Sequence, residues 1–319
     1  SSSNDSDSGS GSNSSPVFAS SAIISVAENS TAVVTVNATD ADSDPITYSI
    51  TGGADQLLFN INSSSGALSF ISAPDFEAPG DSDSNNTYLV QVSASDGSST
   101  VNQLITATVT NLNDTPPVFT SAATVSIAEN STTVVTVNAT DADNDPITYS
   151  ITGGADQLLF NINSSSGALS FISAPDFEAP GDSDSTYTKL HQECDSELSS
   201  TLDQVITATV TNLNDTPPVF TSAATVSVAE NSITVVTVNA TDADNDPITY
   251  SITGGVDQLL FNINSSSGAL SFISAPDFEA PGDSDNNNTY LVQVGASDGI
   301  STTDQLITIS VTDINEAQF

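Results

Sequence analysis

Hydrophobic and polar residues alternate in short runs along most of the chain, and turn-forming residues separate the runs roughly every 8 to 12 residues. From Pro16 to Asp114 this alternation predicts seven strands, and no stretch shows a helical period. The predicted inward positions are Ile24/Val26, Val34/Val36/Ala38, Ile46/Tyr48/Ile50, Phe59/Ile61, Leu68/Phe70, Tyr88/Val90/Val92/Ala94 and Ile105/Ala107/Val109. Short strands of this kind predict an antiparallel β-sandwich.

The same pattern occurs three times with a period of 101 residues, as the positions of Pro16, Pro117 and Pro218 show. We therefore expect a disordered Ser/Gly/Asp linker at 1–15 and three repeats at 16–115, 116–216 and 217–319. Residues 36–84 and 137–185 differ at one position only. Neighbours this similar risk exchanging strands during folding, which favours a role as spacers in which length matters more than individuality.

The segment Asn111–Phe119, NLNDTPPVF, ends the first repeat, and Asn212–Phe220 repeats it. Its prolines exclude a central strand and stiffen the chain, so we expect a rigid joint between folded units. Its carboxylate and carbonyl oxygens are the ligands that Ca²⁺ prefers. An altered form, DINEAQF, closes the chain at Asp313–Phe319.

The chain carries 40 acidic residues against one basic residue, for a net charge of −39. Nucleic acid is excluded as a partner because phosphate binding needs Lys and Arg, and an anionic membrane surface is disfavoured for the same reason. This excess of acidic residues is explained either by a solvated halophilic surface or by metal sites at fixed positions. One cysteine excludes an internal disulfide framework, no apolar run is long enough for a membrane span, and the absence of Met indicates a processed or excised chain.

Acidic and amide motifs recur at the predicted strand ends and loops: AEN at Glu28, DAD at Asp40, DFE at Asp75, SDG at Asp96, and the NLND joint. A seven-stranded sandwich gathers such loops at its two poles, so an ion held between neighbouring poles would convert flexible beads into a rod. The alternative is that these Asx-rich motifs serve only as turns and caps.

These motifs, in this order and three times over, resemble a run of cadherin repeats of the bacterial cadherin-like type. VNATDADNDPITYSI, FNINSSSGALSF, PDFEAP, YLVQVSASDG and NLNDTPPVF carry the resemblance, which covers about Pro16 to Phe319. The resemblance implies tandem seven-stranded antiparallel Greek-key β-sandwiches, cadherin-like and immunoglobulin-like, joined by calcium-binding linkers. Ca²⁺ is the cofactor that it implies.

The resemblance also implies which residues hold Ca²⁺ at each junction. At the first junction the ligands implied are Glu28, Asp75, Glu77, Asn113 and Asp114 from the repeat before the junction, with Asp141 and Asp143 from the repeat after it. At the second they are Glu129, Asp176, Glu178, Asn214 and Asp215, with Asp242, Asp244 and Asp298. The joints depart from the family pattern at Asn111 and Thr115 and at Asn212 and Thr216, and the missing carboxylate at the first position weakens charge compensation for one ion.

We expect a calcium-stiffened extracellular adhesion or spacer module, secreted or tethered as a lipoprotein. Its expected partners are calcium ions and either other cadherin-like repeats, in homophilic contacts, or surface glycans and proteins. The alternative is a filament subunit, or the repeat region of a larger surface protein or enzyme. Lys189, His191 and Cys194 are unique and clustered, but a Cys–His pair three residues apart on a strand faces opposite ways, so no enzyme activity is expected.

The repeat breaks at 186–200. The 101 period places ionisable residues, among them Lys189 and Asp195, where the first repeat has the inward face of a core strand. Burying one unpaired charge costs several kcal/mol, so we predict a one-residue slip of this strand or local disorder. Glu197 then no longer replaces Asp96, and the first junction should bind calcium more weakly than the second.

Overall fold

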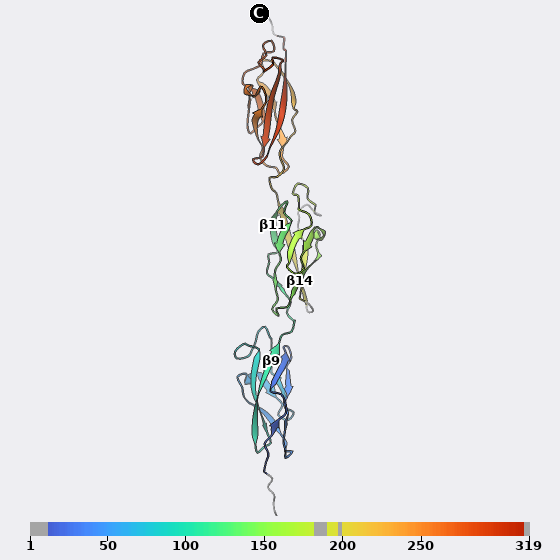
Figure 1. Cartoon of the computed structure of the whole chain (residues 1–319), viewed down its shortest axis with the longest axis vertical. Helices are drawn as coiled ribbons and strands as arrows, with labels where there is room; N and C mark the ends of the chain where they lie inside the picture. The colour runs from blue at the N-terminus through green and yellow to red at the C-terminus, as the bar shows by residue number, and fades with distance from the viewer. Residues whose placement is uncertain (1–11, 182–189, 197–199, 316–319) are drawn as a thin grey trace, which may run out of the picture.

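The computed structural model describes residues 12–181, 190–196 and 200–315. Within these ranges the chain forms three β-sandwiches that lie end to end along one long axis, with single-chain connections between them (Figure 1). We call them the first, second and third sandwich, and residues 111–117 and 212–218 the first and second joint. The predicted class of tandem all-β domains is confirmed.

Each sandwich contains the strands that the alternation predicts, together with two very short ones. The first has β1 Val17–Phe18, β2 Ile23–Ala27, β3 Ala32–Thr35, β4 Ala38–Thr39, β5 Thr47–Gly52, β6 Phe59–Ile61, β7 Ala67–Phe70, β8 Thr87–Ser95 and β9 Thr100–Thr110. The second has β10 Val118–Phe119, β11 Thr124–Ala128, β12 Thr133–Thr136, β13 Ala139–Thr140, β14 Ile147–Gly153, β15 Phe160–Ile162, β16 Ala168–Phe171, β17 Leu190–Ser196 and β18 Ser200–Thr211. The third has β19 Val219–Phe220, β20 Thr225–Ala229, β21 Thr234–Thr237, β22 Ala240–Thr241, β23 Thr249–Gly254, β24 Phe261–Ile263, β25 Ala269–Phe272, β26 Thr289–Ser297 and β27 Thr302–Thr312.

One sheet of the first sandwich has the order β2-β9-β8-β5, the other has the order β3-β7-β6, and β1 pairs with β4. Most pairs are antiparallel as expected, but β2 runs parallel to β9. The chain crosses the sandwich an odd number of times, so its first and last long strands point the same way and pair in parallel when adjacent. The same odd number places the entry and the exit at opposite poles, which extends the chain into a row.

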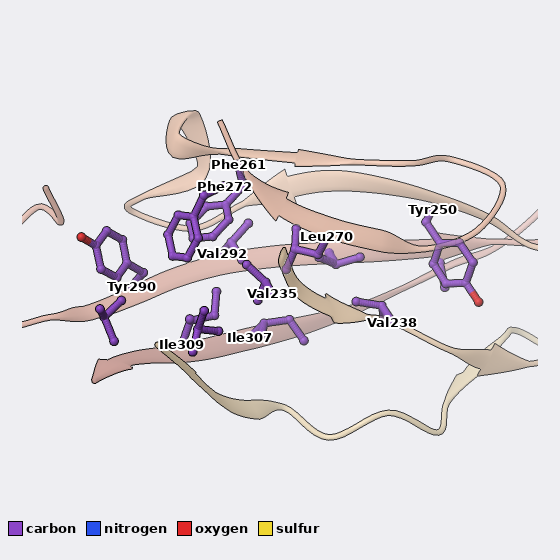
Figure 2. Close-up of a cluster of buried hydrophobic side chains, with 14 residues drawn as sticks. Val235, Val238, Tyr250, Phe261, Leu270, Phe272, Tyr290, Val292, Ile307 and Ile309 are labelled. Carbon is purple, nitrogen blue, oxygen red and sulfur yellow. The ribbon is translucent and has the colours of Figure 1, made fainter. Parts of the chain in front are cut away.

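The core of each sandwich is built from the inward positions of these strands. In the third sandwich the rings of Phe261 and Phe272 pack at 4.6 Å between centroids, and Tyr290 meets Phe272 edge-on at 5.1 Å (Figure 2). Aromatic pairs in this geometry add stability beyond the apolar area that they bury. In the first sandwich the equivalent residues Phe59, Phe70 and Tyr88 are also buried.

The register of β17 differs from that of its two counterparts. Tyr48 on β5 lies opposite Ala94 on β8, whereas its counterpart Tyr149 on β14 lies opposite Cys194 on β17. The 101 period aligns Ala94 with Asp195, so the backbone of β17 has slipped by one residue relative to β14. The predicted slip is confirmed for the backbone register.

The ladder between β17 and β18 shows the same offset. Val90 lies opposite Ile105 in the first sandwich, whereas Leu190 lies opposite Ile206 in the second. The period alone would place position 191 there. Residues 186–189 and 197–199 of the altered segment lie outside the described residues.

Candidate metal centres at the joints

A buried glutamate anchors each joint to the sandwich that precedes it in the chain. Glu28, only 2% exposed, follows directly after β2. Its two carboxylate oxygens accept hydrogen bonds from the backbone N–H of Leu112 in the first joint, at 2.7 Å, and of Phe76 in the DFE loop, at 2.7 Å. Glu129 holds Leu213 and Phe177 in the same way at the second joint. Two loops that are distant in sequence are thereby brought to one pole.

The residue after this glutamate also takes part in the joint, although it was not among the residues predicted from the sequence. Asn29 has a left-handed φ of 62°, a conformation that Asn tolerates better than most residues. Its side-chain amide donates a hydrogen bond to the Asp114 carboxylate, and Asn130 donates to Asp215. The recurrence of the AEN triplet could have indicated this, because Asn both tolerates a left-handed φ and carries a side-chain amide that can donate a hydrogen bond.

The sandwich that follows each joint in the chain contributes a buried aspartate, Asp143 at the first joint, whose carboxylate contacts the joint. Oδ2 of Asp143 accepts hydrogen bonds from the backbone N–H of Asp114, at 3.1 Å, and of Thr115, at 2.9 Å. The side chain of Asn111 donates to the carbonyl of Asp143 at 2.8 Å. Asn111 and Thr115 are the two departures from the family pattern at this joint, and Asn111 through its side chain and Thr115 through its backbone N–H both donate hydrogen bonds to the second sandwich. The joint therefore belongs to both units.

Carboxylates from the sandwiches before and after each joint, and from the joint itself, converge. Candidate ligand oxygens of Glu28, Glu77, Asp114 and Asp143 all lie within 4.8 Å of one another, as do those of Glu129, Glu178, Asp215 and Asp244. Asp143 also belongs to a second group of this kind, with Asp141 and Asp145. Asp145 was not among the predicted ligands.

The closeness of these acids raises their proton affinity. Burial is the largest cause that raises the pKa of Glu77 to about 7, and the neighbouring carboxylates of Asp143 and Glu28 add to it. Burial likewise raises the pKa of Glu178 to about 7, together with Asp244 and Glu129. A protein that gathers such groups without a cation holds them against mutual repulsion.

Several buried oxygens at the joints have no hydrogen-bond donor. They are Asp141 Oδ2 and Asp143 Oδ1 at the first joint, and Glu178 Oε1, Asn214 Oδ1, Asp242 Oδ2, Asp244 Oδ1 and Asp298 Oδ2 at the second. Leaving a buried polar atom without a partner costs free energy, and a charged one costs more. An all-oxygen set of carboxylates and amide carbonyls, with partly unsatisfied lone pairs, fits a hard divalent cation such as Ca²⁺.

The second joint has one more acid in place than the first within the described residues. Asp298, only 8% exposed, accepts hydrogen bonds at Oδ1 from the backbone N–H of Ile300 and Ser301, at 2.7 and 2.6 Å. Asn214 donates its side-chain amide to the carbonyl of Asp298 at 3.1 Å. Position 197, which the sequence aligns with Asp298, lies outside the described residues.

The remaining predicted residues lie in the same loops. Asp75 and Asp176 each close the turn of their DFE loop, accepting the backbone N–H of Ala78 and Ala179 at 2.9 Å. Asn113 is half-buried in the first joint. Acidic groups also occur at the outer poles: Asp40, Asp42 and Asp44 in the first sandwich, and Glu230, Glu279 and Asp313 in the third.

Of the three clustered unusual residues, two lie in a described strand. His191 and Cys194 belong to β17, and Lys189 lies outside the described residues. Among the described residues, no helix is long and apolar enough to cross a membrane.

Comparison with known proteins identifies the repeats. A cadherin domain model matches residues 22–111. Human Protocadherin Fat 1 is 31% identical over 257 residues, which cover 75% of this chain and 5% of that protein. Mouse Protocadherin Fat 4 is 31% identical over 317 residues, covering 92% of this chain and 6% of that protein. The chain therefore spans only a small part of these relatives.

Solved structures show the same fold. Mouse Cadherin-23 EC22-24 superposes with a TM-score of 0.65 at 23% identity, covering 95% of this chain and all of that one. Human CDH23 EC21-23 gives a TM-score of 0.66 at 20% identity. The relatives found are animal cadherins and protocadherins, so these comparisons do not support the bacterial type that the sequence suggested.

Proposed function

We propose that this chain, which belongs to the cadherin repeat family, works as a calcium-stiffened extracellular adhesion or spacer module. The observation that carries the proposal is the convergence of Glu28 and Glu77 from the first sandwich and Asp114 from the first joint with Asp143 from the second sandwich. A cation bound there would connect two sandwiches that are otherwise joined covalently only by the single chain segment of the joint. The equivalent group at the second joint would extend this stiffening to all three.

The residues that would hold Ca²⁺ at each joint are those of the converging groups and those with the unpaired oxygens, together with Asp75, Asn113 and Asp176 from the same loops. The proposed sets are Glu28, Asp75, Glu77, Asn113, Asp114, Asp141 and Asp143 at the first joint, and Glu129, Asp176, Glu178, Asn214, Asp215, Asp242, Asp244 and Asp298 at the second. When bound, the ion supplies positive charge that removes the mutual repulsion of the carboxylates. The backbone hydrogen bonds to Glu28 and Asp143 orient these side chains before binding.

Binding to the folded joints should raise stability by RT ln(1 + [Ca]/Kd) at each site. With an extracellular Kd of about 10⁻⁴ to 10⁻³ M, a hundredfold excess contributes about 2.7 kcal/mol per independent site. The test is thermal unfolding and calorimetric titration with Ca²⁺, comparing wild type with the double variant Asp143→Asn/Asp244→Asn. Asp304→Asn removes one negative charge from an exposed residue of β27 and serves as the control.

We expect the double variant to lose most of the calcium-induced rise in melting temperature, while Asp304→Asn keeps it. Small-angle scattering should show a longer and narrower distribution of lengths with Ca²⁺ than with EDTA. Superimposable melting curves with EDTA and with Ca²⁺ would refute the calcium part of the proposal. Identical scattering in both conditions would mean that the prolines alone set the geometry.

The extracellular location, the partners and the larger context are part of the same proposal. We propose that the chain acts outside the cell, secreted or surface-tethered, and binds other cadherin-like repeats or surface glycans and proteins. The small share of each relative that it spans supports a role as the repeat region of a longer surface protein. We place the domain limits within the joints, at 115/116 and 216/217, and limited proteolysis without calcium tests them.

A further inference from the structure

A buried asparagine just before β8 contacts the DFE loop of the first sandwich. Asn86 is 9% exposed, and its side-chain Nδ2 donates a hydrogen bond to the backbone carbonyl of Phe76 at 2.9 Å. The backbone N–H of Phe76 donates to the carboxylate of Glu28 at 2.7 Å. Both backbone polar groups of Phe76 are therefore held, the N–H by the buried glutamate and the carbonyl by Asn86.

Phe76 lies between two of the proposed calcium ligands, Asp75 and Glu77. Fixing its backbone on both sides limits the directions in which these two neighbouring side chains can point. A ligand oxygen of Glu77 lies within 4.8 Å of one from Asp143, on the far side of the joint. The position of Glu77 relative to the second sandwich thus depends on how firmly the DFE loop is held.

Asn86 is in turn fixed by the rest of the first sandwich. Asp81, only 5% exposed, accepts hydrogen bonds from the backbone N–H of Asn85, at 2.8 Å, and of Asn86, at 3.2 Å. The carbonyl of Asn86 accepts a hydrogen bond from the N–H of Val109 on β9 at 2.9 Å. Because β9 leads directly into the first joint, Asn86 connects the DFE loop to the strand that carries the joint.

The conformation of Asn86 has two local costs. Its φ of 63° is left-handed, and its buried Oδ1 has no hydrogen-bond partner among the described residues. Asn288 in the third sandwich has the same features, with a φ of 61°, an unpaired Oδ1 and a bond from Nδ2 to the carbonyl of Phe278 at 2.9 Å. Glycine would adopt this φ without either cost. The feature that only asparagine adds here is the bond from its amide to the DFE loop.

The second repeat offers a natural comparison. The 101 period aligns Asn86 with Tyr187, which carries no amide and lies outside the described residues. Phe177 of this repeat is 42% exposed, whereas Phe76 and Phe278 are half-buried and pack against the cores of their sandwiches. The bond from the backbone N–H of this phenylalanine to the buried glutamate is present in all three repeats. The aromatic ring of the DFE loop is thus packed in the two repeats whose sequence has the asparagine.

We propose that Asn86 is a positioning residue for calcium at the first joint, because it holds the DFE loop so that Glu77 faces the joint. This inference rests on the proposed calcium sites and adds a residue that supports a ligand without touching the ion. Hydrogen-bond partners behind metal ligands commonly change metal affinity about ten- to hundredfold. Asn288 makes the same bond in the third sandwich, but its DFE loop faces an outer pole, where Glu279 lies with Glu230 and Asp313.

The test is calorimetric titration of Asn86→Gly with Ca²⁺, in an Asp244→Asn background that weakens the second joint so that the first is measured. Glycine keeps the left-handed φ and removes only the side chain. We expect the calcium affinity of the first joint to fall about tenfold. The matched control is Asn288→Gly, which loses the same hydrogen bond at the outer pole and should leave the affinity of the first joint unchanged. Denaturant unfolding in EDTA should show similar losses of stability for the two variants.

A double-mutant cycle with Glu77→Gln tests whether Asn86 acts through this ligand. If it does, Asn86→Gly should lower the calcium affinity much less once Glu77 has been replaced. The inference is overturned if the two glycine variants have equal affinities at the first joint, or if the loss is the same with and without Glu77. Wild type that binds no calcium would refute the proposed function itself. Calcium binding by wild type that Asn86→Gly leaves unchanged would refute this inference alone.

Discussion

Two strands at the same place in the repeat, β8 in the first sandwich and β17 in the second, differ in the residues at their aligned positions and in their pairing register. On β8 the inward positions are apolar, and Tyr88 is 2% exposed and accepts a hydrogen bond from the backbone N–H of Gly80 at 3.1 Å. On β17 the aligned positions carry ionisable residues, and the backbone is shifted by one residue in both of its ladders.

When the packing of the core and the position of a metal-binding loop require different registers, the core dominates. Keeping the register would align the loop after the strand with the SDG loop of the other repeats, but it would place charged groups in the core. Burying one unpaired charge in the core costs several kcal/mol, which exceeds the free energy that one ligand contributes to an ion site. The slip is the outcome that this order of magnitude favours.

The largest expected effect comes from replacing the altered segment of the second repeat with the sequence of the first. Replacing residues 188–198 by TYLVQVSASDG from the first repeat should restore the register of β8 and raise the stability of the second sandwich by several kcal/mol. Hydrogen exchange of the second sandwich and denaturant unfolding are the measurements. If protection in β14 and β18 stays the same after the swap, the conflict between core and register is not what limits this sandwich.

The reverse change places a charged residue at an inward position of the third sandwich, whose repeat is not altered. Tyr290→Lys in the third sandwich copies the residue found at position 189 and removes an aromatic contact with Phe272 at 5.1 Å. We expect a loss of about 3 to 5 kcal/mol, as for other large-to-small core changes, with the buried charge added. Thr302→Lys, at an exposed position of β27, is the control and should change stability by less than about 0.5 kcal/mol. Equal unfolding midpoints for the two variants would contradict this explanation.

A smaller effect is expected at the metal. Asp298→Asn removes a carboxylate that the second joint has in place, and should lower the calcium affinity of that joint roughly ten- to hundredfold. The first joint, whose aligned position is Glu197, should be unaffected. Calorimetric titration that resolves the two joints would show them becoming more alike. A uniform loss at both joints would mean that Asp298 acts through overall charge.

The smallest effect is a pH dependence that calcium should reverse. The pKa of Glu77 and of Glu178 is raised from the ordinary value of 4.5 to about 7. Between these values the folded protein binds more protons than the unfolded one, so without calcium the free energy of unfolding should fall as the pH rises from about 4.5 to 7. With calcium it should rise, because binding requires the deprotonated carboxylates.

Melting temperatures at pH 5 and pH 8, with and without calcium, measure this effect. The Glu77→Gln/Glu178→Gln variant should lose the calcium-free pH dependence in this window. A calcium-free melting temperature that rises steadily from pH 5 to pH 8 would show that other groups dominate the titration.

The local sequence was enough to predict the strands, the repeats and the positions of the acidic loops. Alternation at positions such as Val90, Val92 and Ala94 has the strand period of two, and the prolines of the joints interrupt it. The slip of β17 was predictable for the same reason, because a one-residue shift exchanges the two faces of a strand. These features depend on residues close together in the chain.

Contacts between residues far apart in the chain could not be predicted from the sequence, because they depend on the packing of distant elements. That Asn29 bonds to Asp114, and that Asn111 bonds to the carbonyl of Asp143, depends on how two poles meet across a joint. The parallel pairing of β2 with β9 likewise arises from the packing of distant strands. Periodicity specifies which face of an element is apolar, but the direction of a polar side chain at a pole is set by the partners that the fold brings to it.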